Sequence, residues 1–317
     1  MPLKIARIET SGAVRWAVES PAGLRVLSGD YPATRAFFEN GGPQDAADAA
    51  QGGDIVEADR ILSPVTRDAK FICQATNYAS HVREVGGDPD AITNNVFFTK
   101  ASSCIVAADA AIIRPPHVRL LDYEIELGLV LKHGWEGPQE ITEANLADWI
   151  GGLVIVNDVT ARDVQISHMQ FHKSKSYRTF GPVGPWLVLP SPAELARWRD
   201  LELVLAVDGE QRQRSLAGDM IFKPAETLAE LSRIMDLAPG DLIATGTPGG
   251  VALHPPSAFV QALAGFLTPA KRFKAFMKGQ LPRAAYLRDG QVMTAAIRTQ
   301  DGVIDLGQQT NLIKPTS

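Results

Sequence analysis

The sequence predicts a β-rich α/β protein with a mixed, mainly antiparallel sheet system and a small N-terminal domain. Short runs of apolar and β-branched residues recur along the chain, bounded by Gly, Pro, Asn and Asp. Few stretches place apolar residues at the spacing of a helix. The chain contains no internal repeat and no low-complexity tract. Many strands with few helices favour a mixed sheet system over a doubly wound parallel sheet.

Residues 1–62 are expected to form the small N-terminal domain. Two β-like runs, at 3–10 and 13–20, are separated by a Ser-Gly pair that is typical of a turn. Residues 34–42 predict a short helix that a Gly-Gly pair ends. The polar residues 43–60, rich in Ala and Asp, are compatible with a helix or with a mobile connection.

Residues 63–317 are expected to form the main domain. Two amphipathic segments, at 142–151 and 225–237, predict helices. The remaining apolar runs predict strands at residues 71–77, 103–109, 123–132, 151–158, 184–190, 201–210, 240–246, 292–299 and 303–307.

Composition and charge exclude several classes of protein. The 317 residues are 45% hydrophobic and 21% charged, which is enough apolar material for a sizeable core. The formal net charge of −5 argues against nucleic acid as the main partner, because phosphate binding requires a basic surface. The net charge does not exclude a small anionic substrate, since a few local cations or a metal ion can outweigh the global charge. No run of about 18 apolar residues predicts a membrane span.

The first residues and the cysteines indicate a compartment. The opening MPLKIARIETSG lacks the apolar stretch of a signal peptide, so we expect a cytoplasmic location. Cys73 and Cys104 have no CxxC spacing, and two cysteines do not make a disulfide framework. Both are expected to be small, buried apolar side chains.

Carboxylates in two segments form a candidate metal site. In the alternating run DYEIELGLVLK, Asp122, Glu124 and Glu126 would point to one face of a strand. Asp158 follows an apolar strand, and a carboxylate beside a core strand needs a partner. That partner is either an arginine such as Arg162 or a metal ion shared with the two glutamates. Carboxylate ligands favour Mg²⁺ or Mn²⁺ over zinc, and Ca²⁺ is also compatible. The alternative is a solvated strand face.

His81 and Glu84 form a candidate general base. Their spacing of three residues places both on one side of a helical turn. A carboxylate next to an imidazole orients the ring and raises its basicity, so the pair could activate a water molecule. The alternative is an ordinary surface pair. His168 and His172 have i, i+4 spacing, but no third metal ligand stands out near them.

Six segments, in order over residues 70–251, resemble motifs of the fumarylacetoacetate hydrolase family. The stretch ATNYASHVRE is similar to G-x-N-Y-x-x-H-x-x-E, VFFTKASSCIV to F-x-K-x-x-S, and DYEIELGLVL to D-Y-E-x-E-L. Further along, VIVNDVTARDVQ resembles N-D-x-S-A-R-D-x-Q and KSYRTFGPVGPWLV resembles K-S-F-D-T-F-x-P-x-G-P-W. The last segment, GDLIATGTPGGV, resembles G-D-x-I-x-T-G-T-P-x-G-V.

The resemblance implies a fold and a set of site residues. The fold would be a rolled, mixed β-sandwich, often dimeric, so a homodimer is expected. A divalent metal ion would be held by Glu124, Glu126 and Asp158. His81 and Glu84 would activate water, and Lys175 would stabilise developing negative charge. The residues expected to bind the substrate are Arg162, Gln165, Gly246 and Thr247.

The glycine-rich stretch TGTPGG also permits close approach of the backbone to a ligand, because it carries Gly246, Gly249 and Gly250. It matches neither the dinucleotide-binding fingerprint nor the Walker A loop.

The resemblance implies hydrolysis of a carbon–carbon bond in a small anionic oxo-acid. The substrate would be an acylpyruvate or another 1,3-dioxo acid, such as acetylpyruvate or fumarylpyruvate, and pyruvate would be released. Related metal–enolate chemistry is compatible with two alternative activities. One is an oxaloacetate-type decarboxylase, and the other is an isomerase or hydratase of 2-hydroxymuconate-type oxo-acids. A non-catalytic binding protein is a further alternative. The His81 and Glu84 pair favours hydrolysis.

Three features depart from the family pattern. Arg178 stands where the family often has Asp, which would alter the charge near Lys175. Tyr177 replaces the common Phe and adds a hydroxyl group. Residues 252–286 form an insertion that is long for a plain connection. A lid, a dimer contact and an inert excursion are all compatible with it, and we expect it to touch the site or the partner subunit.

Overall fold

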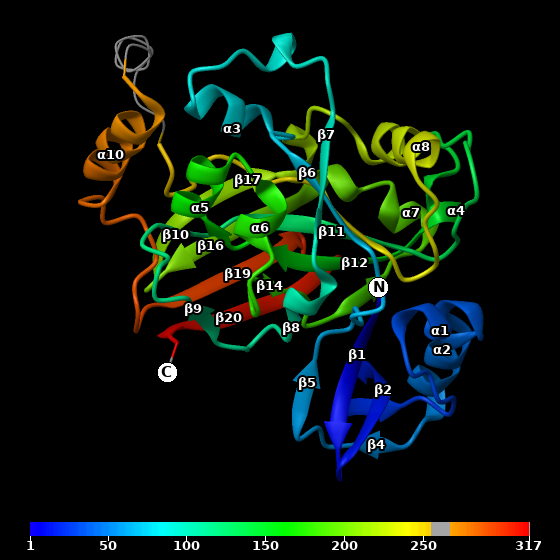
Figure 1. Cartoon of the computed structure of the whole chain (residues 1–317). Coiled ribbons are helices and arrows are strands. Elements are labelled where there is room, and N and C mark those ends of the chain that lie inside the picture. The colour runs from blue at the N-terminus through cyan, green and yellow to red at the C-terminus, as the bar shows by residue number, and fades with distance from the viewer. Residues whose placement is uncertain (255–266, 317) are drawn as a thin grey trace.

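Two β-sheets form the body of the computed structural model, which describes residues 1–254 and 267–316 (Figure 1). One buried apolar cluster contains Leu127 and Leu153 from the larger sheet together with Leu203 and Ile297 from the smaller one. The two sheets therefore pack face to face over a shared core. Most strand pairs are antiparallel and a few are parallel, so the prediction of a mixed, β-rich α/β fold is confirmed.

The larger sheet has eleven strands. Ten of them follow the order β4 (Ile55–Val56), β3 (Gly23–Val26), β2 (Ala13–Ser20), β1 (Leu3–Thr10), β15 (Leu187–Leu189), β12 (Ile150–Asn157), β11 (Ile125–Leu131), β18 (Leu242–Ala244), β6 (Phe71–Ala75) and β7 (Val96–Lys100). The eleventh strand, β5 (Arg60–Leu62), pairs with β1.

The smaller sheet has five strands, in the order β17 (Glu210–Leu216), β16 (Leu201–Val207), β19 (Val292–Thr299), β20 (Asp305–Pro315) and β9 (Ile112–Arg114). Two short ladders pair β10 (Leu121–Asp122) with β13 (Thr160–Ala161), and β14 (Gly181–Pro182) with β8 (Ile105–Val106).

Helices are short and lie around the sheets (Figure 1). They are α1 (Thr34–Glu39), α2 (Gly42–Gly52), α3 (Ala79–Glu84), α4 (Leu146–Trp149), α5 (Arg162–His168), α6 (Phe171–Lys175), α7 (Pro192–Leu195), α8 (Pro224–Ile234) and α10 (Pro269–Gln280). The helices predicted at 34–42 and 225–237 are confirmed, and α2 confirms the helical alternative for the segment after residue 42. None of the helices in the described ranges combines the length and the hydropathy that a membrane span requires.

The helix predicted over 142–151 is much shorter in the structure. The side-chain oxygen of Asn145 accepts the backbone N–H of Thr142 at 2.7 Å, and the Asn145 amide donates to the carbonyl of Glu140. These bonds hold residues 142–145 in a turn, because an Asn side chain competes with the backbone for local hydrogen bonds. Strand β12 already begins at Ile150, so α4 has a single turn.

Strand β17 was not predicted, because its sequence EQRQRSL is polar. It forms a hairpin with β16 through Asp208 and Gly209, whose φ angles are 50° and 80°. Positive φ at both central residues matches the tight turn that an Asp-Gly pair favours. Two other predictions need correction. Residues 103–109 contribute only a two-residue strand, and the strand predicted at 303–307 begins at Asp305 and runs to Pro315.

The N-terminal residues join the larger sheet. Strand β1 pairs with β15 of the main body, with Leu3 opposite Leu189, and strands β2 to β5 extend outward from β1. Figure 1 shows these strands with α1 and α2 to one side of the two packed sheets. The domain boundary at residue 62 stays a prediction.

Strands β11 and β12 carry side chains to two different cores. Ile125 and Leu127 of β11 belong to the cluster between the sheets, whereas Val130 belongs to a second cluster on the other face. On β12, Ile155 faces the first cluster and Val156 the second. Even-numbered residues of both strands therefore share the outer face, away from the smaller sheet.

Candidate active site

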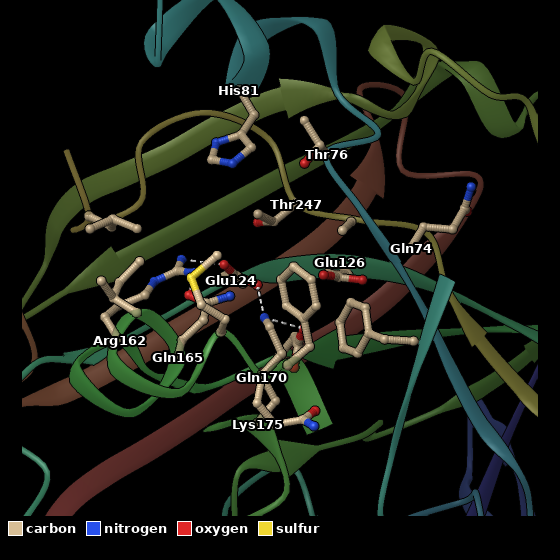
Figure 2. Close-up of a pocket in the computed structure, with 17 residues that line it drawn as sticks. Gln74, Thr76, His81, Glu124, Glu126, Arg162, Gln165, Gln170, Lys175 and Thr247 are labelled. Atoms are coloured by element: carbon tan, nitrogen blue, oxygen red, sulfur yellow. Dashed lines mark hydrogen bonds and ion pairs between the residues drawn. The ribbon is translucent and has the colours of Figure 1, made fainter. Parts of the chain in front are cut away.

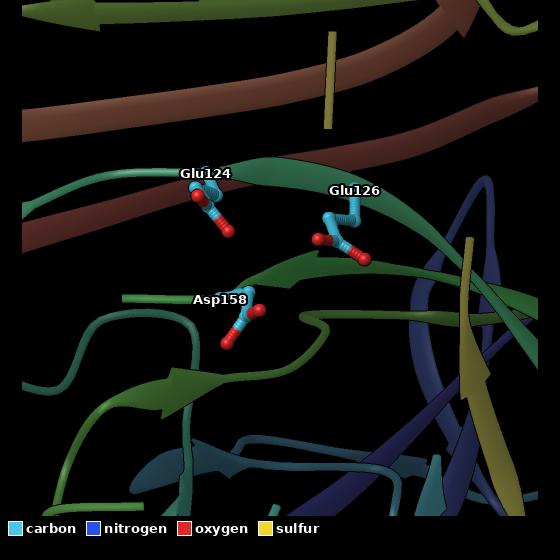
Figure 3. Close-up of side chains that lie close together, drawn as sticks. All are labelled: Glu124, Glu126 and Asp158. Carbon is cyan, nitrogen blue, oxygen red and sulfur yellow. The ribbon is translucent and has the colours of Figure 1, made fainter. Parts of the chain in front are cut away.

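Three carboxylates meet on this outer face, where β11 begins and β12 ends. Glu126 lies opposite Val156 in the antiparallel pair, and the N–H of Asp158 donates to the carbonyl of Glu124 at 2.8 Å. This register brings carboxylate oxygens of Glu124, Glu126 and Asp158 within 4.8 Å of one another (Figure 3). All three residues are buried. The predicted triad is therefore assembled by the pairing of two neighbouring strands.

Two lysines neutralise part of the triad. The ammonium group of Lys175 donates to Glu124 Oε2 and Asp158 Oδ2, both at 2.5 Å, and to Thr160 Oγ1 at 2.8 Å. Lys100 donates to Asp158 Oδ1 at 2.5 Å. Lys100 was not among the predicted site residues. It is the lysine of the motif VFFTKASSCIV, but its contact with Asp158, 58 residues further along the chain, forms only in the folded protein.

Arg162 neutralises the other side of Glu124. Its guanidinium donates to Asp122 Oδ2 at 2.7 Å and, through a second nitrogen, to Glu124 Oε1. Arg162 therefore pairs with these two residues and not with Asp158, which was the alternative considered from the sequence. Asp122 itself is outside the triad. The strict alternation expected from the sequence does not extend to it, because β10 ends at Asp122 and β11 starts only at Ile125.

Glu126 is the carboxylate that lacks a cation. Its Oε2 accepts the backbone N–H of Gly246 at 2.8 Å, and no ion pair joins it to a cation within residues 1–254 and 267–316. Burial, together with Asp158 and Glu124, raises the pKa of Glu126 well above its usual range. The pKa of Glu124 is lowered, because Arg162 and Lys175 outweigh the opposing effect of burial.

The site thus has four buried carboxylates, counting Asp122, against three cations, and this excess of negative charge fits a metal ion. An unpaired buried carboxylate is unfavourable unless a cation or a proton compensates it. Oxygen ligands suit hard divalent cations such as Mg²⁺, Mn²⁺ or Ca²⁺. Glu124, Glu126 and Asp158 are the residues that would hold the ion.

The buried pair of Lys100 and Asp158 leads to a stability prediction. Both side chains are fully buried, and Lys100 also donates to the carbonyl of Phe180 at 2.7 Å. Replacing Lys100 with Met should lower the free energy of unfolding by about 3–5 kcal/mol, because a buried carboxylate loses a partner. Urea denaturation measures this change.

Lys4→Met is the matched control. Lys4 lies 3.4 Å from both Glu19 and Asp305 and is partly exposed, so its loss should cost about 1 kcal/mol or less. Equal effects of the two substitutions would contradict the structural role assigned to Lys100.

His81 enters the same cavity from α3, on the side opposite Lys175 (Figure 2). Its Nδ1 lies 3.8 Å from Glu84 Oε2, which is an ion-pair distance and longer than a hydrogen bond. Glu84 also accepts the N–H of Gly250 at 2.8 Å, and His254 Nε2 lies 3.5 Å from its Oε1. Burial raises the pKa of Glu84, but His81, Gly250 and His254 together lower it below its usual range.

The predicted pair is therefore close in space, with a third member that sequence reasoning missed. His254 showed no signal in the sequence, because its role depends on a long-range contact with α3. It belongs to the segment 252–286, which thus reaches the site at its first residues.

A cavity of about 290 Å³ collects these groups. It is lined by the triad together with the predicted residues His81, Arg162, Gln165, Lys175 and Thr247. Sequence reasoning missed its other members. Eight come from β6, β7, α5, α6 and the residues next to them, and the ninth lies at the start of the insertion: Gln74, Ala75, Thr76, Phe98, Ile166, Met169, Gln170, Phe171 and Leu253.

Two residues predicted to bind the substrate also make contacts within the protein. The N–H of Gly246 holds Glu126, and Gly246 is not among the residues that line the cavity. The hydroxyl group of Thr247 donates to the carbonyl of Ile125 at 2.9 Å and accepts the amide of Gln213 at 2.8 Å. Donation from this hydroxyl to a substrate carboxylate would therefore replace its bond to Ile125, because the group has a single proton to donate.

The glycine-rich stretch makes its close approaches to the protein itself. A side chain at Gly250, where φ is 101°, would meet the carbonyl oxygen of Arg212 at 2.1 Å. A Cβ atom at Gly249 would lie 3.3 Å from a carboxylate oxygen of Glu84. Gly249 thus allows the loop to pack against α3 beside Glu84, and Gly250 allows it to pack against β17.

The family model described as fumarylacetoacetate (FAA) hydrolase C-terminal matches residues 70–314. The chain belongs to this family. A protein of Burkholderia multivorans, provisionally named a hydrolase, is 38% identical over 260 residues, which cover 80% of this chain and 77% of that protein. Members of the fumarylacetoacetate hydrolase family generally depend on a divalent metal, and this chain has the buried acidic triad.

Solved structures of the family agree with this fold. Fumarylacetoacetate hydrolase from Exiguobacterium antarcticum is 29% identical, with a TM-score of 0.75 over 99% of this chain and 100% of that one. The structure of 5-carboxymethyl-2-hydroxymuconate delta-isomerase from Mycobacterium smegmatis is 23% identical, with a TM-score of 0.70 and the same coverage. At that identity the second likeness bears on the fold alone.

The structure places the departures from the family pattern as follows. Arg178 is exposed, whereas Lys175 is buried among its carboxylate partners. The hydroxyl group of Tyr177 lies 2.9 Å from His117 Nε2, at the surface. Within the insertion, residues 255–266 are outside the described part of the chain. Gln280 of α10 donates to the carbonyl of His254 at 2.8 Å, which anchors α10 to the start of the insertion.

Proposed function

We propose that this protein hydrolyses a carbon–carbon bond in an acylpyruvate or a similar 1,3-dioxo acid and releases pyruvate. The observation that carries the proposal is that His81 and the acidic triad line one cavity from opposite sides (Figure 2). A cation site and a base facing the same small space are what metal-assisted hydrolysis requires.

Glu124, Glu126 and Asp158 would hold Mg²⁺ or Mn²⁺, with Ca²⁺ also compatible. When bound, the ion acts as a Lewis acid that polarises a carbonyl group and stabilises enolate charge. The remaining chemistry belongs to side chains. Glu84 faces His81 Nδ1, which leaves His81 Nε2 to accept a proton from water.

Hydrolysis then proceeds at the acyl carbonyl, distal to the carboxylate. The hydroxide adds to that carbon, and the bond to the neighbouring methylene breaks. Its electron pair passes to the methylene carbon as the enolate of pyruvate, which takes up a proton, so one water is consumed and an acyl acid and pyruvate are formed. Lys175 would stabilise the developing negative charge, and Arg162 and Gln165 would orient the substrate.

Isomerisation of a 2-hydroxymuconate-type oxo-acid is the second candidate, because His81 and Glu84 could also carry a proton between two carbons. A structural relative bears the name of such an isomerase. Isomerisation leaves the carbon skeleton intact, so release of pyruvate separates the two reactions.

The test is an ultraviolet assay of acetylpyruvate with Mg²⁺ or Mn²⁺ and with EDTA, with pyruvate measured in parallel. We expect metal-dependent loss of the diketone-enol absorbance with one pyruvate formed per substrate consumed. Turnover that EDTA leaves unchanged would contradict the role of the triad. No turnover by a sample that binds metal would contradict the hydrolase proposal, and oxaloacetate decarboxylation and isomerisation would be tested next.

A further inference from the structure

We propose that the substrate is a mono-acid whose acyl arm carries no charge, and not a dicarboxylate such as fumarylpyruvate. This inference rests on the proposed hydrolysis of acylpyruvates and concerns the part of the same cavity that receives the acyl arm. Three observations carry it: the ion pairs of the two buried cations, the neutral residues of the remaining wall, and the surroundings of His81.

The two fixed cations of the cavity already have carboxylate partners. All three donors of Lys175 are used, by Glu124, Asp158 and Thr160. Arg162 donates to Asp122 and Glu124, and its remaining terminal nitrogen donates to the Gln165 side chain at 2.9 Å. These cations lie at the end of the cavity where the acidic triad is, and neither is available to a carboxylate at the far end of the acyl arm.

Within residues 1–254 and 267–316, every other residue that lines the cavity is neutral, apart from His81. Five apolar side chains from four segments form much of this wall, namely Phe98, Ile166, Met169, Phe171 and Leu253. The rings of Phe98 and Phe171 stack with centroids 5.0 Å apart, which makes a flat apolar surface beside the Lys175 ammonium. Away from the triad, the described wall therefore offers an acyl arm uncharged groups, with His81 as the exception.

His81 is a poor partner for a second carboxylate. Its Nδ1 faces the ionised Glu84, so an anion drawn toward this histidine would also approach a carboxylate. His254, which follows the cavity-lining Leu253, already faces Glu84. A second substrate carboxylate would therefore lose its water without gaining a cation, which is unfavourable.

Two substrates of equal length test the inference on the intact enzyme. Fumarylpyruvate and crotonylpyruvate differ only in a terminal carboxylate, which crotonylpyruvate replaces with a methyl group. We expect kcat/KM for crotonylpyruvate to exceed that for fumarylpyruvate by about tenfold or more, the factor that about 1.4 kcal/mol of unfavourable desolvation produces. Equal values, or a preference for fumarylpyruvate, would overturn the inference and leave the proposed hydrolysis intact.

Binding without turnover separates this inference from the proposed function. If neither compound is hydrolysed, the hydrolase proposal fails, but calorimetry with the His81→Ala variant still reports the affinity for each compound. Tighter binding of crotonylpyruvate supports an uncharged arm, whereas equal or tighter binding of fumarylpyruvate contradicts it.

A charge placed on the neutral wall should reverse the preference. Leu253 lines the cavity, and its backbone N–H, which donates to Asp122, is kept in any substitution except proline. Leu253→Lys should raise the ratio of kcat/KM for fumarylpyruvate over crotonylpyruvate by about tenfold, whereas the uncharged control Leu253→Met should leave it near the parental value. A ratio that Leu253→Lys leaves unchanged would count against this wall as the site of the acyl arm.

Discussion

Replacing His81 with alanine should lower kcat for carbon–carbon hydrolysis by about 10²–10⁴-fold, the range expected when a general base is lost. The ring is the one histidine that lines the cavity in the described part of the chain, and its Nδ1 faces Glu84. It makes no contact with the triad that would affect the cation site. Metal affinity, measured by calorimetry, should therefore stay within about twofold of the parental value.

His133→Ala is the control for this substitution. His133 is exposed, and its Nδ1 contacts the carbonyl of Asp148, in a loop that does not line the cavity. Its loss should leave kcat unchanged. Full activity of His81→Ala would remove this residue from the mechanism, and loss of metal binding would show that it acts on the cation site instead.

Replacing Glu126 should abolish metal binding and lower kcat/KM by about 10³-fold, corresponding to about 4 kcal/mol of transition-state stabilisation. Either alanine or glutamine removes the charge, but glutamine keeps the volume and avoids a cavity. The stability of the metal-free protein, in contrast, should not fall when Glu126 is replaced with glutamine. Glu126 is a buried carboxylate without a cationic partner, so Glu126→Gln should leave its thermal midpoint unchanged or raise it.

Asp158→Asn supplies the contrast. It also removes a triad carboxylate, but it leaves Lys100 and Lys175 without their shared partner, so the metal-free protein should lose about 3–5 kcal/mol of stability. Differential scanning fluorimetry with and without Mn²⁺ measures both effects. Equal destabilisation by the two substitutions would contradict the assignment of Glu126 as the uncompensated carboxylate.

The site residues that could be predicted from the sequence were those in ordered motifs. Glu124 and Glu126 lie within one short stretch whose periodicity brings both to one face, and His81 and Glu84 lie within another. Asp158 follows a separate apolar strand. The roles of Lys100, although it lies in one of the motifs, and of His254 could not be predicted from periodicity. Each meets its partner only after strands or loops far apart in the sequence have packed together.

The fold was predicted best where hydrophobic periodicity dominates. Buried strands such as β11 and β12 are long apolar runs, and α8 has a clear amphipathic pattern. The failures occurred where local hydrogen bonding decides the structure. Side-chain hydrogen bonds of Asn145 form a turn where a helix was predicted. The Asp208-Gly209 turn pairs the polar segment 210–216 with β16 as a strand, although the composition of that segment did not predict one.

Because alternate residues of β11 and β12 face opposite sides of the sheet, the cation site depends on which side each carboxylate faces. A deletion of one residue within β11 would make the Glu126 side chain point into the core between the two sheets and would bring a leucine to the outer face. Residues 132–149, which connect the two strands, carry no such constraint, because their length changes neither strand's pairing. Relatives of this protein should therefore differ freely in the length of that connection while keeping the spacing of ligands within each strand.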